Sequence, residues 1–455
     1  MELLTELTVF KHKLWAFEYA DRMEKWFRGF SQAPIRIDAE PHTRCNLNCR
    51  MCARRGSTYE KLTEEERRVI ELTPKKWVNI AEEAGKMGVK AWNISGLCEP
   101  LSRPDILFPL MKMIKAYDMF GELTTNGTLW NEKYVRETIE MGWDSICISI
   151  DAHDAKIHDF LRGVKGTFKR AIQTLKKFYQ MKKKYKTSLP VLTVNVVLNK
   201  LNYMCLSDIV KMVNQFGGDA IFVEPMIVFG QFCEKLKMDK KEIDEFVEVA
   251  KVAKELANQL GILLDITTIA PGEAFSDEKK FDKNLIKNAG EIKNLLIDEA
   301  KTFEDKILSI PCYYPWFNLM IRADGSTVHC GEWKGESENI KTTSLSDIWF
   351  GKILSRIRDQ FSKGELPSSC EKCRPNVIED TRIVRKSIKE FNNLDFLKGK
   401  YIEFLEENKR LKQEIFSLRR KGFADDIKCV NCKYKKEIEK FKNSLIYKIF
   451  RLLRT

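Results

Sequence analysis

Three cysteines close together in the chain are the residues best suited to chemistry. Cys45, Cys49 and Cys52 are separated by three and then two residues, and they follow the apolar run 35–39. Thiolates at such spacings can converge on one point, where they commonly hold an iron–sulfur cluster. Three cysteines on a four-iron cube leave one iron without a protein ligand, and that open iron is where a reaction can take place.

Two other interpretations of this cysteine loop remain open. Free cysteines are often buried, and zinc also binds closely spaced cysteines. A zinc site would need a fourth ligand nearby, for which His42 is a candidate. The position of the cysteines in a loop directly after a predicted strand favours the cluster.

The spacing of these three cysteines matches the CxxxCxxC signature, so the chain resembles the radical S-adenosylmethionine (radical SAM) superfamily. Met51 stands where that family often has an aromatic residue. The resemblance implies a [4Fe–4S] cluster whose open iron binds the amino and carboxylate groups of SAM. It also implies that one electron passed through the cluster cleaves SAM to a 5′-deoxyadenosyl radical.

Short apolar runs alternate with helical patterns along the first half of the chain. The predicted strands are residues 35–39, 91–95, 122–125, 145–150, 192–198 and 220–223. Helical patterns fill the intervals, at 74–86, 105–117, 131–141, 167–184 and 206–216. This order predicts an α/β fold with a parallel sheet, a partial (β/α)6 TIM-type barrel. Such barrels keep their chemistry at the carboxyl ends of the strands, where the cysteine loop also lies.

Motifs at the ends of the next strands add to the family resemblance. Residues 95–100 (Ser-Gly-Leu-Cys-Glu-Pro) resemble the GGEP motif, with Cys98 in place of a glycine, and Glu99 can accept from an ammonium group. Residues 124–127 resemble the TNG element, and residues 149–151 with Arg162-Gly163 resemble the S-x-D…RG element. Taken singly, each could be an ordinary strand exit with turn residues.

The resemblance implies a set of SAM-binding residues at this edge of the sheet. They are Ser95, Gly96, Glu99, Pro100, Asn126, Ser149, Asp151 and Arg162. Arg162 suits the SAM carboxylate because a guanidinium matches planar carboxylates. Asn195 and Glu224 are weaker candidates, and Glu224 is expected to face the substrate.

Four later cysteines form a second candidate site, namely Cys312, Cys330, Cys370 and Cys373. Residues 323–326 (Ala-Asp-Gly-Ser) predict a hairpin turn that returns the chain from Cys312 toward Cys330. On spacing alone, zinc remains an alternative. The pattern resembles the twitch domain, a shortened SPASM domain, which implies one auxiliary [4Fe–4S] cluster with four cysteine ligands. Such a cluster would move one electron to or from a substrate radical.

These patterns divide the chain into five segments. We expect an N-terminal helical extension at 1–33, the radical SAM core barrel at 34–235, a helical insert or connector at 236–305, the twitch (SPASM-like) domain at 306–378, and a basic coiled-coil and amphipathic helical tail at 379–455. The sequence shows no membrane-length apolar run and no signal peptide, which favours a cytoplasmic location. In that compartment metal ligation explains the 13 cysteines better than disulfides do.

The tail carries most of the net charge of +13, because residues 381–455 hold 21 Lys and Arg against 10 Asp and Glu. Heptad spacing over 394–418, with Asn408 at an a-type position, predicts a homodimeric coiled coil, the alternative being a helix folded back on the barrel. The basic amphipathic pattern over 435–455 predicts peripheral contact with the inner membrane or an acidic partner. Both patterns explain the tail without nucleic acid. Cys429 and Cys432 have no assigned role.

A barrel with a single-cluster twitch domain is similar to 2-deoxy-scyllo-inosamine dehydrogenase. The resemblance implies a dehydrogenase-like oxidoreductase that oxidises or remodels a sugar-like or aminocyclitol-like small molecule, with flavodoxin or ferredoxin as electron donor. The last residues are similar to the ends of some bacterial surface-polysaccharide glycosyltransferases. This similarity implies that the enzyme acts in surface-polysaccharide biosynthesis. One alternative is a SPASM-type peptide maturase, although 33 N-terminal residues are short for a leader-binding domain. The other is a non-catalytic iron–sulfur electron carrier.

Overall fold

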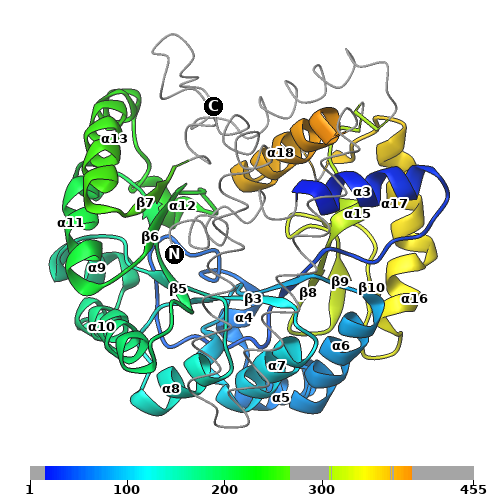
Figure 1. The fold of residues 1–455 in the computed structure, drawn as a ribbon, viewed down its shortest axis with the longest axis horizontal. Helices are drawn as coiled ribbons and strands as arrows, with labels where there is room; N and C mark the ends of the chain where they lie inside the picture. Colours follow the sequence, from blue (N-terminus) through cyan, green and yellow to red (C-terminus); the bar gives the residue numbers. More distant parts are fainter. Residues whose placement is uncertain (1–15, 267–306, 309, 369, 371–372, 392–455) are drawn as a thin grey trace.

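The computed structural model describes residues 16–266, 307–308, 310–368, 370 and 373–391 of the 455 residues. The tail patterns at 394–418 and 435–455, with Cys429 and Cys432, therefore lie outside the described residues. The proposed connector is described over 236–266. Figure 1 shows a curved sheet with an arc of helices on its outer side.

The six predicted strands are confirmed. They are β1 (Arg36–Ala39), β2 (Ala91–Ile94), β3 (Phe120–Thr125), β4 (Ser145–Ser149), β5 (Val191–Leu198) and β6 (Ala220–Pro225). They pair in parallel in chain order. The inner strands are buried on both faces, as the fully buried β4 shows, because helices cover the outer face and side chains fill the barrel.

The helices between the strands cover the outer face of the sheet (Figure 1). They are α6 (Pro74–Met87), α7 (Pro104–Ala116), α8 (Glu132–Glu140), α10 (Thr167–Tyr185) and α11 (Leu206–Phe216). Side-chain caps begin several of them: the Thr73 hydroxyl accepts from Lys76 N, and the Asn131 side chain accepts from Tyr134 N. Shorter helices are α4 (Thr58–Lys61), α5 (Glu64–Ile70), α9 (Ala155–Arg162), α12 (Gln231–Glu234), α15 (Tyr314–Phe317), α16 (Leu345–Phe350), α17 (Lys352–Ser362) and the 3₁₀ turns η1 (Pro100–Ser102) and η2 (Tyr203–Cys205).

A seventh parallel strand extends the predicted barrel. The helix α13 (Lys240–Leu260) leads into β7 (Leu263–Asp265), which pairs with β6. The sequence pattern did not indicate β7, because three residues are too few to show an alternation.

The C-terminal hairpin joins the same sheet on the opposite side. Strand β8 (Asn318–Ile321) pairs in parallel with β1 and antiparallel with β9 (Ser326–Val328), which pairs with β10 (Glu338–Asn339). The predicted turn at 323–326 is confirmed, with Gly325 at φ +84°. The sheet order is β10-β9-β8-β1-β2-β3-β4-β5-β6-β7. The auxiliary domain is thus continuous with the barrel, and the carboxyl ends of β8 and β1 are neighbours.

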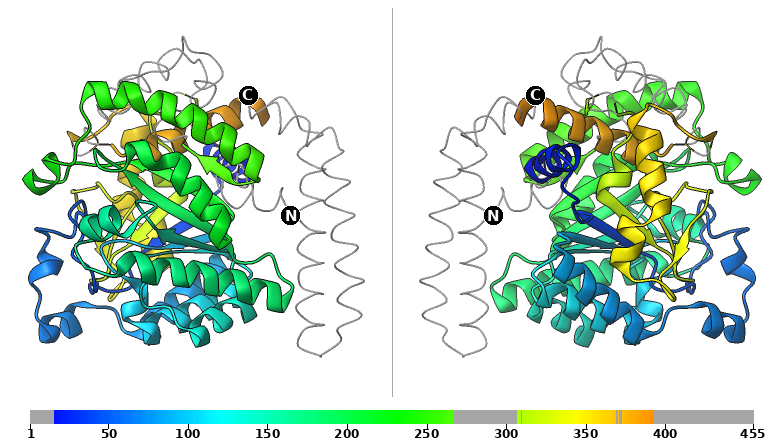
Figure 2. Two further views of the ribbon diagram at one scale, coloured as in Figure 1. Left: turned by 90° about the vertical axis from the view of Figure 1, so that its left-hand side faces the viewer. Right: turned by 90° about the vertical axis from the view of Figure 1, so that its right-hand side faces the viewer.

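A continuous apolar core fills the space between the sheet and the helices. Its largest fully buried side chains include Trp77, Trp92 and Trp143. Within the N-terminal segment, the helix α3 (Ala16–Phe27) lies beside α18 (Pro375–Phe391) in both views of Figure 2. In the described part of the chain, no helix is both long and apolar enough to cross a membrane.

Candidate active site

The loop between β1 and α4 presents the three cysteines of the first motif. Cys45, Cys49 and Cys52 are all partly exposed, and Arg54 N donates to Cys52 Sγ at 3.4 Å. Burial, together with the charges of Glu99 and Cys49, raises the pKa of Cys45 to about 12. Burial also raises the pKa of Cys49, with a contribution from Cys52, so the three thiols lie within each other's electrostatic reach. Neighbouring thiols of this kind fit a metal cluster, which displaces their protons when it binds.

Neighbouring strand ends hold this loop from two sides. On one side, Arg54 donates to Leu97 O at 2.8 Å and thereby joins the loop to the Ser95–Pro100 turn. On the other side, Arg50 N donates to Leu161 O at 2.7 Å, and the Arg50 guanidinium lies 4.3 Å from the Phe160 ring centre. The loop is therefore anchored to the exits of both β2 and β4.

Arg162 and Gly163 lie at the end of α9, where the close approach of the cysteine loop requires a glycine at position 163. Gly163 has φ +71°, and a Cβ built there would lie 2.1 Å from Asn48 O, so only glycine lets the cysteine loop pass. Arg162 contacts Cys49 and forms an ion pair with Asp151 at 2.6 Å. Asp151 is fully buried and also accepts from Val197 N at 3.1 Å. Asp151 thus pairs with Arg162 from a fully buried position.

Glu99 lies in a closed polar environment beside the cysteine loop. Its carboxylate accepts from Thr125 Oγ1 at 2.7 Å and from Asn126 N at 2.7 Å, and the side chain is 1% exposed. Burial raises the pKa of Glu99 to about 7. The carboxylate still has unused acceptor capacity, because two oxygens offer about four lone-pair sites. Glu99 also acts electrostatically on Cys45, so it lies close to the loop.

The other SAM-binding candidates lie at the same edge of the sheet. Asn126 Nδ2 donates to Asn46 Oδ1 at 2.9 Å, which ties the exit of β3 to the cysteine loop. Ser95 Oγ accepts from Asn93 at 3.2 Å in the turn that also contains Gly96 and Pro100. Gly96 has φ +115°, and a Cβ there would lie 2.2 Å from the side chain of Glu40.

Two candidates, Asn195 and Glu224, lie on the later strands β5 and β6. Ser149 at the end of β4 is in register with Asn195 of β5. Asn195 Nδ2 donates to Glu224 Oε1 at 2.8 Å, so the weaker pair of candidates is joined. The structure therefore places the SAM-binding candidates on strands β2 to β6 or in the loops and helices that directly follow them.

His42 does not face the thiols. It is fully buried, its Nδ1 accepts from Arg44 N at 3.1 Å, and its Nε2 lies 3.2 Å from Pro100 O. Burial lowers the pKa of His42 to about 4, so the ring is neutral at pH 7. The zinc interpretation thus loses its fourth ligand, because both ring nitrogens bond the backbone and join the cysteine loop to the Glu99 turn.

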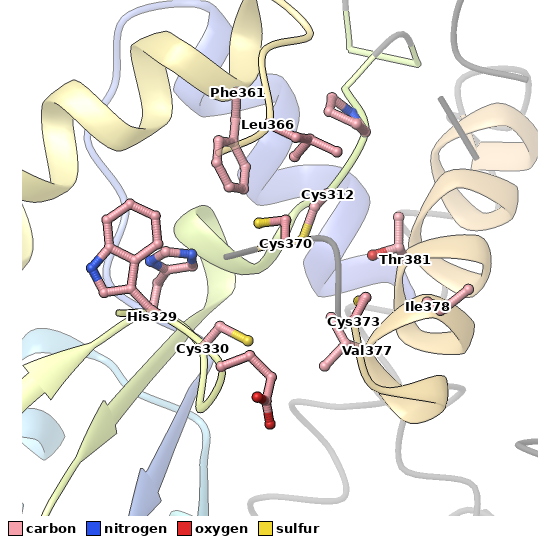
Figure 3. Close-up of a pocket in the computed structure, with 13 residues that line it drawn as sticks. Cys312, His329, Cys330, Phe361, Leu366, Cys370, Cys373, Val377, Ile378 and Thr381 are labelled. Atoms are coloured by element: carbon pink, nitrogen blue, oxygen red, sulfur yellow. The ribbon is translucent and has the colours of Figure 1, made fainter. Parts of the chain in front are cut away.

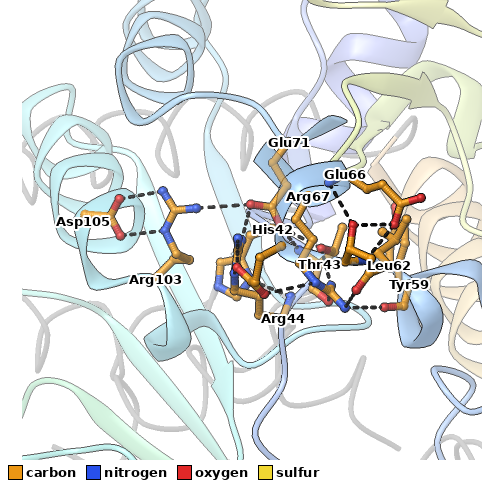
Figure 4. Close-up of polar contacts among 12 residues, drawn as sticks. His42, Thr43, Arg44, Tyr59, Leu62, Glu66, Arg67, Glu71, Arg103 and Asp105 are labelled. Atoms are coloured by element: carbon orange, nitrogen blue, oxygen red, sulfur yellow. Dashed lines mark hydrogen bonds and ion pairs between the residues drawn. The ribbon is translucent and has the colours of Figure 1, made fainter. Parts of the chain in front are cut away.

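A buried ionic network beneath the loop escaped the sequence analysis (Figure 4). Glu71 accepts from Thr43 N at 2.9 Å and Thr43 Oγ1 at 2.7 Å, and it pairs with Arg44 and with Arg103 at 3.1 Å. Although burial alone would raise the pKa of Glu71, the hydrogen bonds from Thr43 and Arg44 lower it. The network holds the start of the cysteine loop. Its only sequence signal is the run of charges over 64–71.

The four later cysteines line one apolar cavity (Figure 3). They come from three segments: Cys312 precedes α15, Cys330 follows β9, and Cys370 with Cys373 precedes α18. Burial raises the pKa of Cys312 to about 12 and the pKa of Cys330 to about 11. In the described residues, no three His, Cys, Asp or Glu side chains converge closely enough for one metal ion. The four thiols instead surround a cavity, which fits a fully ligated cluster.

Aromatic side chains form one wall of this cavity. His329 is 1% exposed, and its ring lies 4.8 Å from Trp333 and 5.7 Å from Phe361. Burial, followed by the charge of Arg358, lowers the pKa of His329 to about 3. At the cavity rim, Arg374 pairs with Glu332 at 2.5 Å.

Comparison with known proteins agrees with both cysteine groups. Residues 40–213 match the radical SAM superfamily, and residues 312–374 match the SPASM iron–sulfur cluster-binding domain. The chain therefore contains a radical SAM domain and, C-terminal to it, a SPASM iron–sulfur domain. The radical SAM domain takes a [4Fe–4S] cluster and SAM as cofactors, and the SPASM domain takes auxiliary iron–sulfur clusters.

Several curated proteins share part of the sequence. The chain is 25% identical over 222 residues to the sporulation killing factor maturation protein SkfB of Bacillus subtilis (strain 168), covering 48% of this chain and 49% of SkfB. It is 26% identical over 228 residues to the AdoMet-dependent heme synthase of Methanosarcina barkeri, covering 49% and 61%. It is 26% identical over 234 residues to the PqqA peptide cyclase of Methylorubrum extorquens (strain PA1), covering 50% and 57%. The chain thus spans about half of the length of these relatives.

Solved structures share the fold. Streptococcus suis SuiB bound to S-adenosylmethionine has a TM-score of 0.55 at 17% identity, covering 77% of this chain and 74% of SuiB. The complex of SuiB with its precursor peptide SuiA has a TM-score of 0.53 at 18% identity, covering 77% and 73%. Native anSMEcpe with bound AdoMet has a TM-score of 0.50 at 14% identity, covering 81% and 99%.

Proposed function

We propose that this protein is a radical SAM enzyme that modifies a peptide, in place of the sugar-like substrate favoured by the sequence. Two of the curated relatives bear names that describe peptide chemistry, a killing factor maturation protein and a peptide cyclase. The heme synthase, by its name, has another kind of substrate, so the test below includes non-peptide compounds.

The pairing of β8 with β1 is the structural observation that best supports the proposed radical chemistry. Because β8 pairs with β1, the cysteine loop after β1 and the cysteine cavity beside β8 open from adjacent parts of the same sheet. When bound, the clusters and SAM supply radical generation and one-electron transfer. A substrate in the barrel mouth would lie between these two sites.

The proposed roles of the chain's own residues follow from their placement. Cys45, Cys49 and Cys52 would hold the first cluster, and Cys312, Cys330, Cys370 and Cys373 the auxiliary one. Ser95, Gly96, Glu99, Pro100, Asn126, Ser149 and Arg162 would surround SAM, with Asp151 orienting Arg162 through their 2.6 Å ion pair.

Glu224 is the residue we propose as a proton acceptor. Asn195 holds its Oε1 at 2.8 Å, so the second carboxylate oxygen remains for the substrate. Burial raises the pKa of Glu224, and the charges of Arg374 and Arg162 both act on it. Arg374 at the rim of the auxiliary cavity and Arg162 beside the first cysteine loop thus both act electrostatically on Glu224. An oxidised substrate radical releases a proton, and a carboxylate with a raised pKa is suited to take it.

The remaining sequence-based proposals concern partners. Homodimerisation through 394–418, membrane contact through 435–455 and reduction by flavodoxin or ferredoxin are proposals that rest on the sequence. The two tail segments lie outside the described residues.

Substrate competition in the reduced, anaerobically reconstituted enzyme tests the proposal. The probes are a pool of synthetic peptides encoded beside the gene and a pool of nucleotide sugars. We expect the peptides to raise 5′-deoxyadenosine above the uncoupled rate and the nucleotide sugars to leave it unchanged. The reverse result would return the sugar hypothesis. An enzyme with intact clusters that never cleaves SAM would support the electron carrier instead.

A further inference from the structure

We propose that Arg358 is a fixed positive charge that raises the reduction potential of the auxiliary cluster and so makes it an electron acceptor. Arg358 lies in α17 and is 6% exposed. Its guanidinium carbon lies 4.8 Å from the ring centre of Trp26 and 4.4 Å from that of Trp349. The charge is therefore enclosed by two indole rings and shielded from water.

Arg358 has no acidic partner among the residues that the structure describes. Its Nε donates to Pro315 O at 2.9 Å, whereas its Nη2 is buried without a hydrogen-bond partner in the described part of the chain. Buried charges are normally paired, because an isolated one carries a large desolvation cost. An unpaired guanidinium in this position therefore calls for a role that needs its charge.

The enclosed charge lies directly behind the wall of the cysteine cavity. Pro315, which accepts its hydrogen bond, is three residues beyond Cys312. Phe361 follows Arg358 by three residues of helix, which advance the chain by about 4.5 Å. Phe361 lines the cavity and contacts His329, the residue before Cys330 (Figure 3). Arg358 thus faces the segments that carry two of the four thiols.

The sign of the effect follows from electrostatics. Reduction adds a negative charge to a cluster, and a nearby positive charge stabilises that reduced form. The interaction is strong because the aromatic surroundings have a low dielectric constant and admit little salt. Burial lowers the pKa of Arg358 to about 9, so the guanidinium keeps its proton at neutral pH.

Two nearby arginines show why Arg358 is distinct. Arg374 at the cavity rim pairs with Glu332 at 2.5 Å, and the exposed Arg356 pairs with Glu336. A carboxylate at this distance cancels most of the long-range field of each cation. Among these three arginines, Arg358 alone has no carboxylate partner in the described structure.

The test is a redox titration of the auxiliary cluster by electron paramagnetic resonance. The full-length chain carries Cys45→Ala, Cys49→Ala and Cys52→Ala, so that only the auxiliary cluster contributes to the signal. We expect Arg358→Gln to lower the ratio of reduced to oxidised cluster about tenfold at a fixed solution potential, which corresponds to about 59 mV for one electron. Arg358→Lys keeps the charge and should retain most of the parent potential.

Arg356→Gln is the matched control, because it removes a charge two residues away in the same helix but from an exposed ion pair. It should leave the potential unchanged. Arg358→Met, which also removes the charge but fills the space between the indoles, guards against a folding defect in Arg358→Gln. Equal shifts in the Gln and Lys variants, or unchanged potentials in the Gln and Met variants, would overturn the proposal.

Loss of iron from both neutral variants would also overturn it, since Arg358 would then only hold the Cys312 segment in place. The titration needs no substrate, so its result is independent of whether the enzyme modifies peptides.

Discussion

The two cysteine sites of this protein are built in opposite ways. The first site takes its thiols from eight consecutive residues, 45–52, in a partly exposed loop that polar groups from several strand ends hold. The second takes its thiols from 312–373 and places them in a cavity lined by apolar and aromatic side chains. An open, polar environment suits the role proposed for the first site, which is to admit SAM and substrate. A cavity shielded from water suits the role proposed for the second site, which is to transfer electrons.

The largest effect that separates the two sites should come from removing one thiol of each. Cys49→Ala should abolish 5′-deoxyadenosine formation, because the cluster that binds SAM loses a ligand. Cys312→Ala should still cleave SAM but fail to convert substrate. Chromatographic assay of 5′-deoxyadenosine and mass spectrometry of the substrate measure both. If Cys312→Ala also stopped SAM cleavage, the division of labour between the sites would be wrong.

The buried network under the first loop provides the next largest effect. Glu71→Gln should lower the free energy of unfolding by about 1.5–3 kcal/mol, because Arg44 and Arg103 lose their buried partner and keep only the more exposed Glu64 and Asp105. Because the folded state lowers the pKa of Glu71, its contribution is present above pH 5 and lost as the pH falls through the folded-state pKa.

Denaturant titration between pH 4 and 8 measures this contribution of Glu71. Glu64→Gln is the control, since Glu64 pairs with the same Arg44 from an exposed position and should have little effect. Equal stabilities of the two variants would show that the network does not support the loop.

Glu224→Gln should separate substrate oxidation from radical generation. Without the carboxylate, product formation should fall about 10²-fold, the lower end for general acid–base catalysis. The yield of 5′-deoxyadenosine should be almost unchanged, because Glu224 lies beyond the SAM-binding candidates on β6. The ratio of product to 5′-deoxyadenosine is the measurement. Parallel losses of both would assign Glu224 to SAM binding.

The smallest effect concerns the close packing around the first loop. Gly163→Ala should cost about 1–3 kcal/mol of stability, because φ is positive and the new methyl group meets Asn48 O. Gly142→Ala is the matched control: φ is +69° there, but nothing lies within 4 Å, so only backbone strain applies. Thermal melting with and without SAM measures both. Indistinguishable melts would mean that the loop moves aside freely.

Much of the first site was predictable because its determinants are local. The cysteine spacing, the strand periods and the turn glycines all lie in short stretches, and the structure confirms the six strands that these stretches predict. Which of the predicted site residues contact one another was less predictable. Asp151 and Arg162 were both predicted to bind SAM, and the structure adds that they form a 2.6 Å ion pair with each other, a contact that depends on side-chain packing and not on a local pattern.

The sequence by itself determined the two cysteine groups, the parallel barrel and the class of radical chemistry, because spacing and hydrophobic period are written in consecutive residues. Only the tertiary structure decided that β8 pairs with β1, where Arg36 and Asn318 lie 282 positions apart. It alone also placed Arg358 between two indole rings and turned His42 away from the thiols. These features depend on which distant surfaces pack together, and no local pattern encodes that choice.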